Sequence, residues 1–217
     1  MDSKSFLVAV CFIILMVSVV HVSVTYLKIN DFREKVIGFA LNTAGSLNIT
    51  VLSSIDINFT SRNINWGPGS VNVSGGYLNA TLITRRNNTA EVSGGNWSVT
   101  NISGLLIENV GNVNVSLNLS SSKNATDLFA GTSNTNQAFE WNITNGAPGS
   151  CSGGTILLNT FIKVNKSVSD VACAQLGAVA SKNKVFIDIL LAVPYDFDTS
   201  KINVEQSATI TATAVVA

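Results

Sequence analysis

The sequence predicts a mainly β protein in which one long N-terminal helix precedes an antiparallel β-sandwich. Three observations support this fold class. An uncharged apolar stretch at residues 6–27 is long enough for a membrane helix. From residue 47 onward, short runs alternate apolar and polar residues, as half-buried strands do. The 217 residues include 25 Asn, 25 Ser and 18 Thr, which suit strand faces and turns but are poor helix formers.

The apolar stretch reads FLVAVCFIILMVSVVHVSVTYL, and its 22 residues would span about 33 Å as a helix. A secretory signal peptide has an apolar region of about 7–15 residues, followed by a small-residue cleavage site. Because this stretch is longer and no convincing site follows it, we expect a retained membrane helix. We expect its thiol, Cys11, to be inert, and its imidazole, His21, to be neutral and hydrogen-bonded rather than functional.

The helix is expected to continue past the apolar stretch, because the first plausible stop is at Asn42 to Gly45. Residues at spacings of three and four form an apolar stripe on this continuation, typical of a helix that packs along one side. We predict a leader at 1–5, a helix at 6–45 and a β head at 46–217. The predicted packing residues are Ile29, Phe32, Val36 and Phe39.

The head is expected to contain about ten short strands separated by turns rich in Gly, Pro and Asn, which indicates an antiparallel sandwich. Two runs, 155–164 and 185–193, are more continuously apolar and favour central strands. Asp188 interrupts the second run, and the alternation predicts that it faces solvent. One composite sandwich is favoured because no linker interrupts the pattern; a split near residue 104 is the alternative. Further strands are expected at 47–51, 55–59, 78–82, 113–119, 139–143 and 208–214.

The chain contains 12 Asn-x-Ser/Thr triplets, whereas its composition would give about 5 by chance. Each triplet is an N-glycosylation acceptor. Several of these asparagines stand between apolar neighbours, as Asn142 does between Trp141 and Ile143, so we expect them on the wet face of a strand. We predict sugars at several positions; the alternative is that triplets arise wherever Asn, Ser and Thr coat strands. The triplets begin at Asn48, Asn58, Asn72, Asn79, Asn87, Asn96, Asn101, Asn114, Asn118, Asn124, Asn142 and Asn165.

Only two cysteines, Cys151 and Cys173, follow the apolar stretch. We predict a disulfide between them, which would contribute roughly 3 kcal/mol by closing a loop of about 21 residues; two buried thiols are the alternative. Disulfides and N-linked sugars both belong to exported proteins. The sequence therefore predicts a head on the extracellular side.

Catalytic and ligand-binding constellations are not recognisable in the sequence. A single histidine, placed in the apolar stretch, excludes a His-rich zinc site or a His-based triad in the head. Asp196 and Asp198 are interpreted as a polar β-turn rather than a calcium loop, which needs more ligands at set spacing. The net charge is zero, which argues against nucleic acid as a partner. We expect a protein that is not an enzyme and needs no cofactor or metal.

The N-terminal region resembles the type IV pilin and archaellin group, which joins a short polar leader, a membrane-length helix, an amphipathic continuation and a β-rich head. Archaeal leaders of this group carry a basic residue two before the cut and a small residue just before it. Lys4 and Ser5 occupy those places, so the resemblance implies cleavage between Ser5 and Phe6. The chain lacks the glutamate that bacterial pilins have near the start of the apolar segment, and an ordinary signal-anchor is the alternative.

Much of the chain also resembles small archaeal surface proteins with an N-terminal membrane helix and an immunoglobulin-like β-domain. The resemblance is carried by the strand pair LLIENVGNVNVSLNLSS at 105–121, by WGPGSV at 66–71, by Phe139-Glu140-Trp141, by the late cysteine pair and by Ala192-Val193-Pro194. It implies an immunoglobulin-like sandwich on the cell surface and no assigned activity.

Two functional hypotheses follow. In the first, the chain is a glycosylated structural subunit of an extracellular filament of the pilus or archaellum kind. It would self-associate through the N-terminal helix and reside in the membrane before assembly. In the second, it is a membrane-anchored adhesion or binding protein that does not polymerise and whose loops engage a surface ligand.

Overall fold

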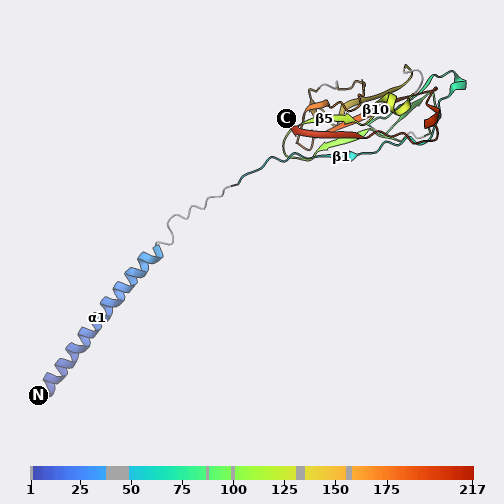
Figure 1. Ribbon diagram of the computed structural model, residues 1–217. Coiled ribbons are helices and arrows are strands. Elements are labelled where there is room, and N and C mark those ends of the chain that lie inside the picture. The colour runs from blue at the N-terminus through green and yellow to red at the C-terminus, as the bar shows by residue number, and fades with distance from the viewer. Residues whose placement is uncertain (1, 38–48, 87, 99–100, 131–134, 155–157) are drawn as a thin grey trace. The chain divides into compact units, whose positions relative to one another are not determined.

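The computed structural model describes residues 2–37, 49–86, 88–98, 101–130, 135–154 and 158–217, which form two compact units, 1–51 and 52–217. The first unit contains the helix α1 (Ser3–Ile37), shown in blue in Figure 1. Within it, the 24 residues Phe6–Ile29 are long and apolar enough to cross a membrane. The helix begins three residues before the predicted start. Its predicted end near residue 43 lies outside the described residues.

The second unit is mainly β, as predicted, and consists of two antiparallel sheets (Figure 1). Every pairing between its named strands is antiparallel. The larger sheet contains β1 (Ile57–Ser61), β2 (Asn79–Ile83), β3 (Glu91–Ser93), β4 (Leu105–Asn109), β6 (Ala138–Asn145), β8 (Ile162–Lys163) and β10 (Lys184–Pro194). The smaller sheet has the order β11 (Ile210–Val216), β5 (Val115–Ser121), β9 (Asp170–Leu176) and β7 (Cys151–Ser152).

The longest strand, β10, organises the larger sheet. One of its edges pairs with β6 over eight residues. The other pairs with β4 at Lys184–Ile187 and then with β2 at Leu190–Pro194. The prediction of a central strand at 185–193 is therefore confirmed, and the partner of that edge changes at Asp188 and Ile189.

The main hydrophobic core lies between the two sheets. Side chains of β4, β6 and β10 meet side chains of β5 and β9, and Trp141, Leu117 and Ile187 are fully buried. The alternation seen in the sequence places Val115, Leu117 and Leu119 on the inner face of β5. A smaller cluster around Trp66, Leu82 and Ile102 extends the core under β2 and β3. Residues 52–217 form one compact unit.

The strands β4 and β5 do not pair with each other, although the resemblance predicted a strand pair there. β4 belongs to the larger sheet and β5 to the smaller one, so the VGNVN segment carries the chain from one layer to the other. Alternation is the same for a hairpin and for such a crossing, and it cannot distinguish them.

Three further elements differ from prediction. The run 155–164 is not a central strand: its described part gives only a bridge at Leu158 and the two-residue strand β8. The described part of 47–51, residues 49–51, belongs to no strand. A short helix, α2 (Ala125–Phe129), was not predicted. Two 3-10 turns, η1 (Val73–Gly75) and η2 (Thr199–Lys201), complete the head.

Candidate functional site

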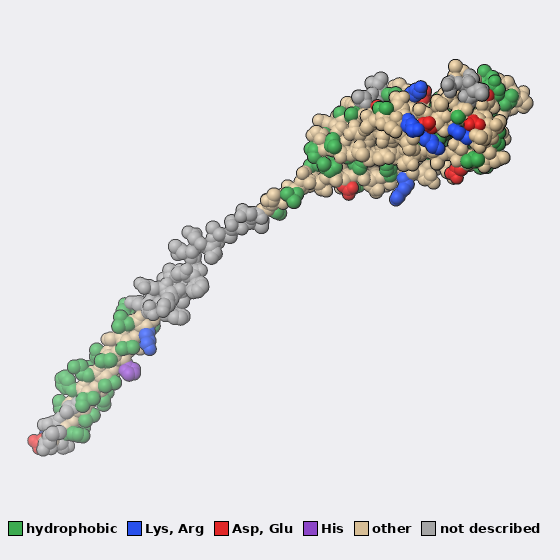
Figure 2. Space-filling model, viewed as in Figure 1, with side chains coloured by type: hydrophobic (Ala, Val, Ile, Leu, Met, Phe, Trp, Pro, Cys, Tyr) green, Lys and Arg blue, Asp and Glu red, His purple; other side chains and the backbone are tan. Residues whose placement is uncertain are grey.

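The surface of α1 is apolar on all sides along its first two thirds. Large side chains such as Phe12, Leu15 and Leu27 are each more than 60% exposed, and Figure 2 shows hydrophobic side chains over the visible face. Ser18 and Ser23 donate their hydroxyl groups to the carbonyls of Ile14 and Val19, both at 2.9 Å. Their polar groups are thus satisfied inside the helix, which suits an environment without water.

The thiol and the imidazole singled out in the sequence both lie on this surface. Cys11 is an exposed free thiol, and His21 is exposed beside Met16, Val17 and Val20. Of the predicted packing residues, Ile29 is 53% exposed at the end of the apolar stretch. The side chains of Phe32 and Val36, and all of Phe39, lie outside the described part. At the predicted cleavage position, Phe6 is exposed, and the side chain of Ser5 is not described.

The predicted glycosylation positions fall into four groups. Asn48 and Asn87 lie outside the described residues. Three side chains are half-buried: Asn79, Asn118 and Asn124. One is buried: Asn142. The remaining six are exposed: Asn58, Asn72, Asn96, Asn101, Asn114 and Asn165.

Four of these asparagines use the side-chain oxygen to hold a turn. Asn72 Oδ1 accepts from the Gly75 N–H at 3.0 Å, and Asn96 Oδ1 accepts from the Ser70 N–H at 2.6 Å. Asn114 and Asn124 accept in the same way from Ala178 and Asp127. A sugar is attached through Nδ2 and leaves Oδ1 in place. These bonds are therefore compatible with glycosylation.

The predictions that Asn142 and Asp188 face solvent are wrong. Asn142 on β6 pairs directly with Asp188 on β10, so both side chains lie on the outer face of the larger sheet. That face is covered here, because Asn142 is 7% and Asp188 only 3% exposed. The alternating pattern correctly predicted that the two side chains lie on the outer face of the sheet. It did not predict that they are buried there.

The carboxylate of Asp188 is buried where the partner of β10 changes. Thr84 follows β2 and bridges the change: its N–H donates to Ile189 O at 2.9 Å, and its hydroxyl oxygen accepts from the Ile189 N–H at 2.8 Å. Burial raises the pKa of Asp188 to about 6, while the positive charges of Arg85 and Arg86 and hydrogen bonds from Thr84 and the Arg86 backbone oppose the rise. Gly104 lies so close that an added Cβ would be 2.6 Å from the carboxylate.

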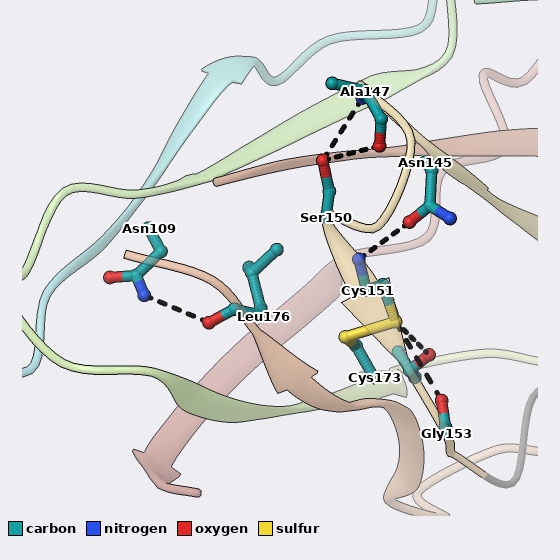
Figure 3. Close-up of a disulfide and its surroundings, with 9 residues drawn as sticks. Asn109, Asn145, Ala147, Ser150, Cys151, Gly153, Cys173 and Leu176 are labelled. Carbon is teal, nitrogen blue, oxygen red and sulfur yellow. Dashed lines mark hydrogen bonds between the residues drawn. A yellow bond between two sulfur atoms is a disulfide. The ribbon is translucent and has the colours of Figure 1, made fainter. Parts of the chain in front are cut away.

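The ENVGN segment contains the most highly connected asparagine of the head. Asn109 is 1% exposed. Its Nδ2 donates to Val113 O at 2.9 Å, Gly177 O at 3.1 Å and Leu176 O at 3.3 Å, and its Oδ1 accepts from the Gly111 N–H at 3.0 Å. It thereby ties the end of β4 to the end of β9 in the other sheet (Figure 3).

The predicted disulfide between Cys151 and Cys173 is present and joins β7 to β9, with 5.6 Å between the Cα atoms. Both residues are buried. The Cys151 N–H donates to Asn145 Oδ1 at 2.7 Å, and the Ser150 hydroxyl donates to Ala147 O at 2.8 Å (Figure 3). Since β7 has only two residues, the bridge and these bonds hold the 146–152 turn against the sheet.

The acidic YDFDTS segment forms a polar turn. Asp198 caps η2 by accepting from the Ser200 N–H at 2.9 Å. Lys201 on η2 then donates to the carbonyl of Asp127 at 2.7 Å, and Phe197 contacts Phe129. The segment therefore serves to fix α2 against the head. Among the described residues, no three His, Cys, Asp or Glu side chains gather as a metal site would require.

The described chain thus offers an apolar helix surface and, on the face shown in Figure 2, a largely uncharged polar head surface. No protein-family model, curated protein or solved structure matches this chain.

Proposed function

We propose that this chain is a structural subunit of an extracellular cell-surface filament of the type IV pilus or archaellum kind. The observation that carries the proposal is α1, a helix of 35 residues whose first part is apolar on every side. Such a surface needs an apolar environment. A bilayer supplies it before assembly, and the packed helices of neighbouring subunits supply it in a filament core.

The transfer between the two environments is physically feasible because their apolar contacts are similar. Exposure to water would cost about 1.5–3 kcal/mol for each large apolar side chain. A subunit that leaves the membrane must therefore exchange lipid for protein contacts without passing through water. Helices that pack against one another along their length meet this requirement.

The head has properties that suit the outside of a filament. We propose that its two sheets form an immunoglobulin-like sandwich, and that sugars occupy several exposed asparagines. Only 12% of the residues are charged. Uncharged faces allow like subunits to approach without repulsion, and the disulfide fits an oxidising exterior.

The alternative is a surface binding protein in which α1 is a permanent anchor, since the same helix meets that need. N-terminal sequencing of the protein from cells distinguishes the two. A mature chain that begins at Phe6 is the expected result. A chain that keeps residues 1–5 and stays in the membrane fraction would contradict the filament proposal.

A second test uses the end of the apolar stretch. Ile29→Asp places a charge on the exposed apolar surface that the filament core would bury, so we expect loss of filaments in electron micrographs. Lys28→Ala is the matched control and should assemble normally. Unchanged filaments from the Ile29→Asp variant would contradict packing through this helix.

A further inference from the structure

The C-terminal strand β11 is an open edge of the smaller sheet. It pairs with β5 in an unbroken register over seven residues, Ile210–Val216, and among the described strands it has no second partner. Seven residues correspond to an edge about 23 Å long. Such an edge is a template for another strand.

The backbone groups that face the open side can be assigned from the hydrogen bonds at the two ends of the β11–β5 pairing. The Ser122 N–H donates to Thr209 O, and the Ala217 N–H donates to Asn114 O. In an antiparallel pair, bonded and non-bonded positions alternate. The odd-numbered residues therefore bond to β5. The N–H and C=O groups of the even-numbered residues point outward: Ile210, Ala212, Ala214 and Val216.

This edge lacks the features that protect edges from pairing. It has no charge, no proline and no register shift over its length. The other edges in the described part of the head are different. β1 has a register shift between Phe59 and Ser61, and β3 has three residues and an ion pair between Glu91 and Arg85. β7 and β8 have two residues each.

A strand-like segment without a strand partner precedes the head. Leu47, Ile49 and Val51 alternate with Asn48 and Thr50. The described residues 49–51 belong to no sheet, and the side chains of Ile49 and Val51 are 81% and 78% exposed. Exposed β-branched side chains in such a pattern favour pairing with an edge.

We propose that residues 49–51 of one copy add as a strand to the open edge of β11 in a second copy. The inference rests on the proposed filament and deepens it by naming a contact that links successive subunits. The segment's apolar phase would continue the inner row formed by Ile210, Ala212 and Ala214, and its polar phase would continue the outer row of Thr211 and Thr213. Main-chain hydrogen bonds supply affinity and the alternate side chains fix the register.

A contact between copies in this form can propagate. The donor segment and the accepting edge are different surfaces, so each subunit can donate to one neighbour and accept from another. Pairing of β11 with β11 would instead close a dimer and leave the apolar side chains of Ile49 and Val51 uncovered.

Cysteine cross-linking of the full chain tests the proposal. Cells would co-express a Thr50→Cys variant with a Thr211→Cys, Thr213→Cys or Val215→Cys variant, all with Cys11→Ser to remove the free thiol. We expect an oxidised mixed dimer for at least one of the three pairs. Thr160→Cys, at an exposed threonine away from β11, is the control partner and should give none.

Two outcomes would overturn the proposal. One is the absence of mixed dimers for all three pairs in material that contains filaments. The other is a dimer from the β11 variants alone, without the Thr50→Cys partner, which would indicate pairing of β11 with itself. Neither outcome would contradict the proposed filament function. Mixed dimers in cells that form no filaments would instead contradict the filament function and support the strand contact.

An edge variant gives an independent measurement. Ala212→Pro removes an outward N–H without breaking a bond to β5, so the head should still fold. We expect loss of the mixed dimer. Thr213→Ala changes only an exposed side chain. Combined with a cysteine at position 211 or 215, it should leave the mixed dimer intact. A mixed dimer that persists in the Ala212→Pro variant would overturn the assignment of the edge.

Discussion

Asp188 is a single carboxyl group whose burial makes the stability of the head depend on pH. Its folded-state pKa of about 6 lies above the ordinary value of 3.8 because burial disfavours the charged form. The folded head therefore holds this proton more tightly than the unfolded chain. The resulting stabilisation is complete below the ordinary pKa and is lost as the pH rises through about 6.

We expect Asp188→Asn to remove this pH dependence. The difference of about two pKa values corresponds to roughly 3 kcal/mol between the protonated and charged states, as an order of magnitude. Urea unfolding of the full chain in detergent at pH 4.5 and pH 7.5 measures it. The wild type should lose stability between these values because of Asp188, and the variant should lose less. An equal loss in both would contradict the burial of a charged Asp188.

Asn109 is a second residue on which the head depends. Asn109→Ala would leave the carbonyls of Val113, Leu176 and Gly177 without the Nδ2 donor of a side chain that is 1% exposed. A buried group left unsatisfied costs about 1–3 kcal/mol. We expect Asn109→Ala to lower the free energy of unfolding, measured with urea, by an amount in the upper part of that range.

Asn114→Ala is the matched control for Asn109→Ala in the same segment. Asn114 is exposed, and its side-chain Oδ1 accepts a hydrogen bond from the Ala178 N–H at 3.2 Å. We expect Asn114→Ala to lower the free energy of unfolding by less than half as much as Asn109→Ala does. Equal effects of the two substitutions would show that Asn109 does not hold the sheets together as its bonds indicate.

These residues show where sequence reasoning succeeds and where it stops. Period-two alternation identified the inner face of β5, because burial against a core acts on every second residue. A continuously apolar run identified β10 as a central strand. Alternation did not predict the burial of Asn142 and Asp188, and the Thr84 hydroxyl beside Asp188 comes from 104 residues earlier in the chain. What covers an outer face is a property of the tertiary structure.

At the scale of elements, α2 was missed although its signal is present in the sequence. Asn124 and Asp127 form a capping box, in which each side chain accepts from the other residue's backbone N–H. The Asn-x-x-Asp spacing is a helix-start signature. The same asparagine begins an Asn-x-Thr triplet.

The cap and the sugar acceptor can be separated by two substitutions in α2. Asn124→Ala removes both, whereas Thr126→Ala removes the triplet and keeps the cap. In protein made without sugars, we expect Asn124→Ala to lower the free energy of unfolding by about 1 kcal/mol, as loss of an N-cap does. Thr126→Ala should cost less. The reverse order in urea unfolding would contradict the role of the cap.

The other element-scale differences have a common cause. The β4–β5 crossing, the short β8 and the unpaired residues 49–51 all concern which strands become partners, and partnership is not encoded in the period of a single strand. The cysteine pair was predictable because the head offers only two thiols. Hydropathy predicted the apolar helix surface, and the triplets predicted the candidate sugar positions. The open edge of β11 could be identified only from the order of strands in the sheet.

At the scale of the whole molecule, the chain divides into two compact units, residues 1–51 and 52–217. Both hydrophobic clusters of the head are built from residues between Ile57 and Ala214. In the first unit, the described stretch Phe6–Ile29 is long and apolar enough to cross a membrane.

A chain that begins at Leu52 tests this division. We expect it to be soluble without detergent and to unfold cooperatively at the same temperature as the head of the full chain, because the core and the disulfide are retained. It should also remain monomeric at concentrations at which the full chain assembles, since it lacks both α1 and residues 49–51. Sedimentation and circular dichroism measure the two properties. A fragment that forms filaments by itself would show that assembly depends on the head surfaces and not on the helix.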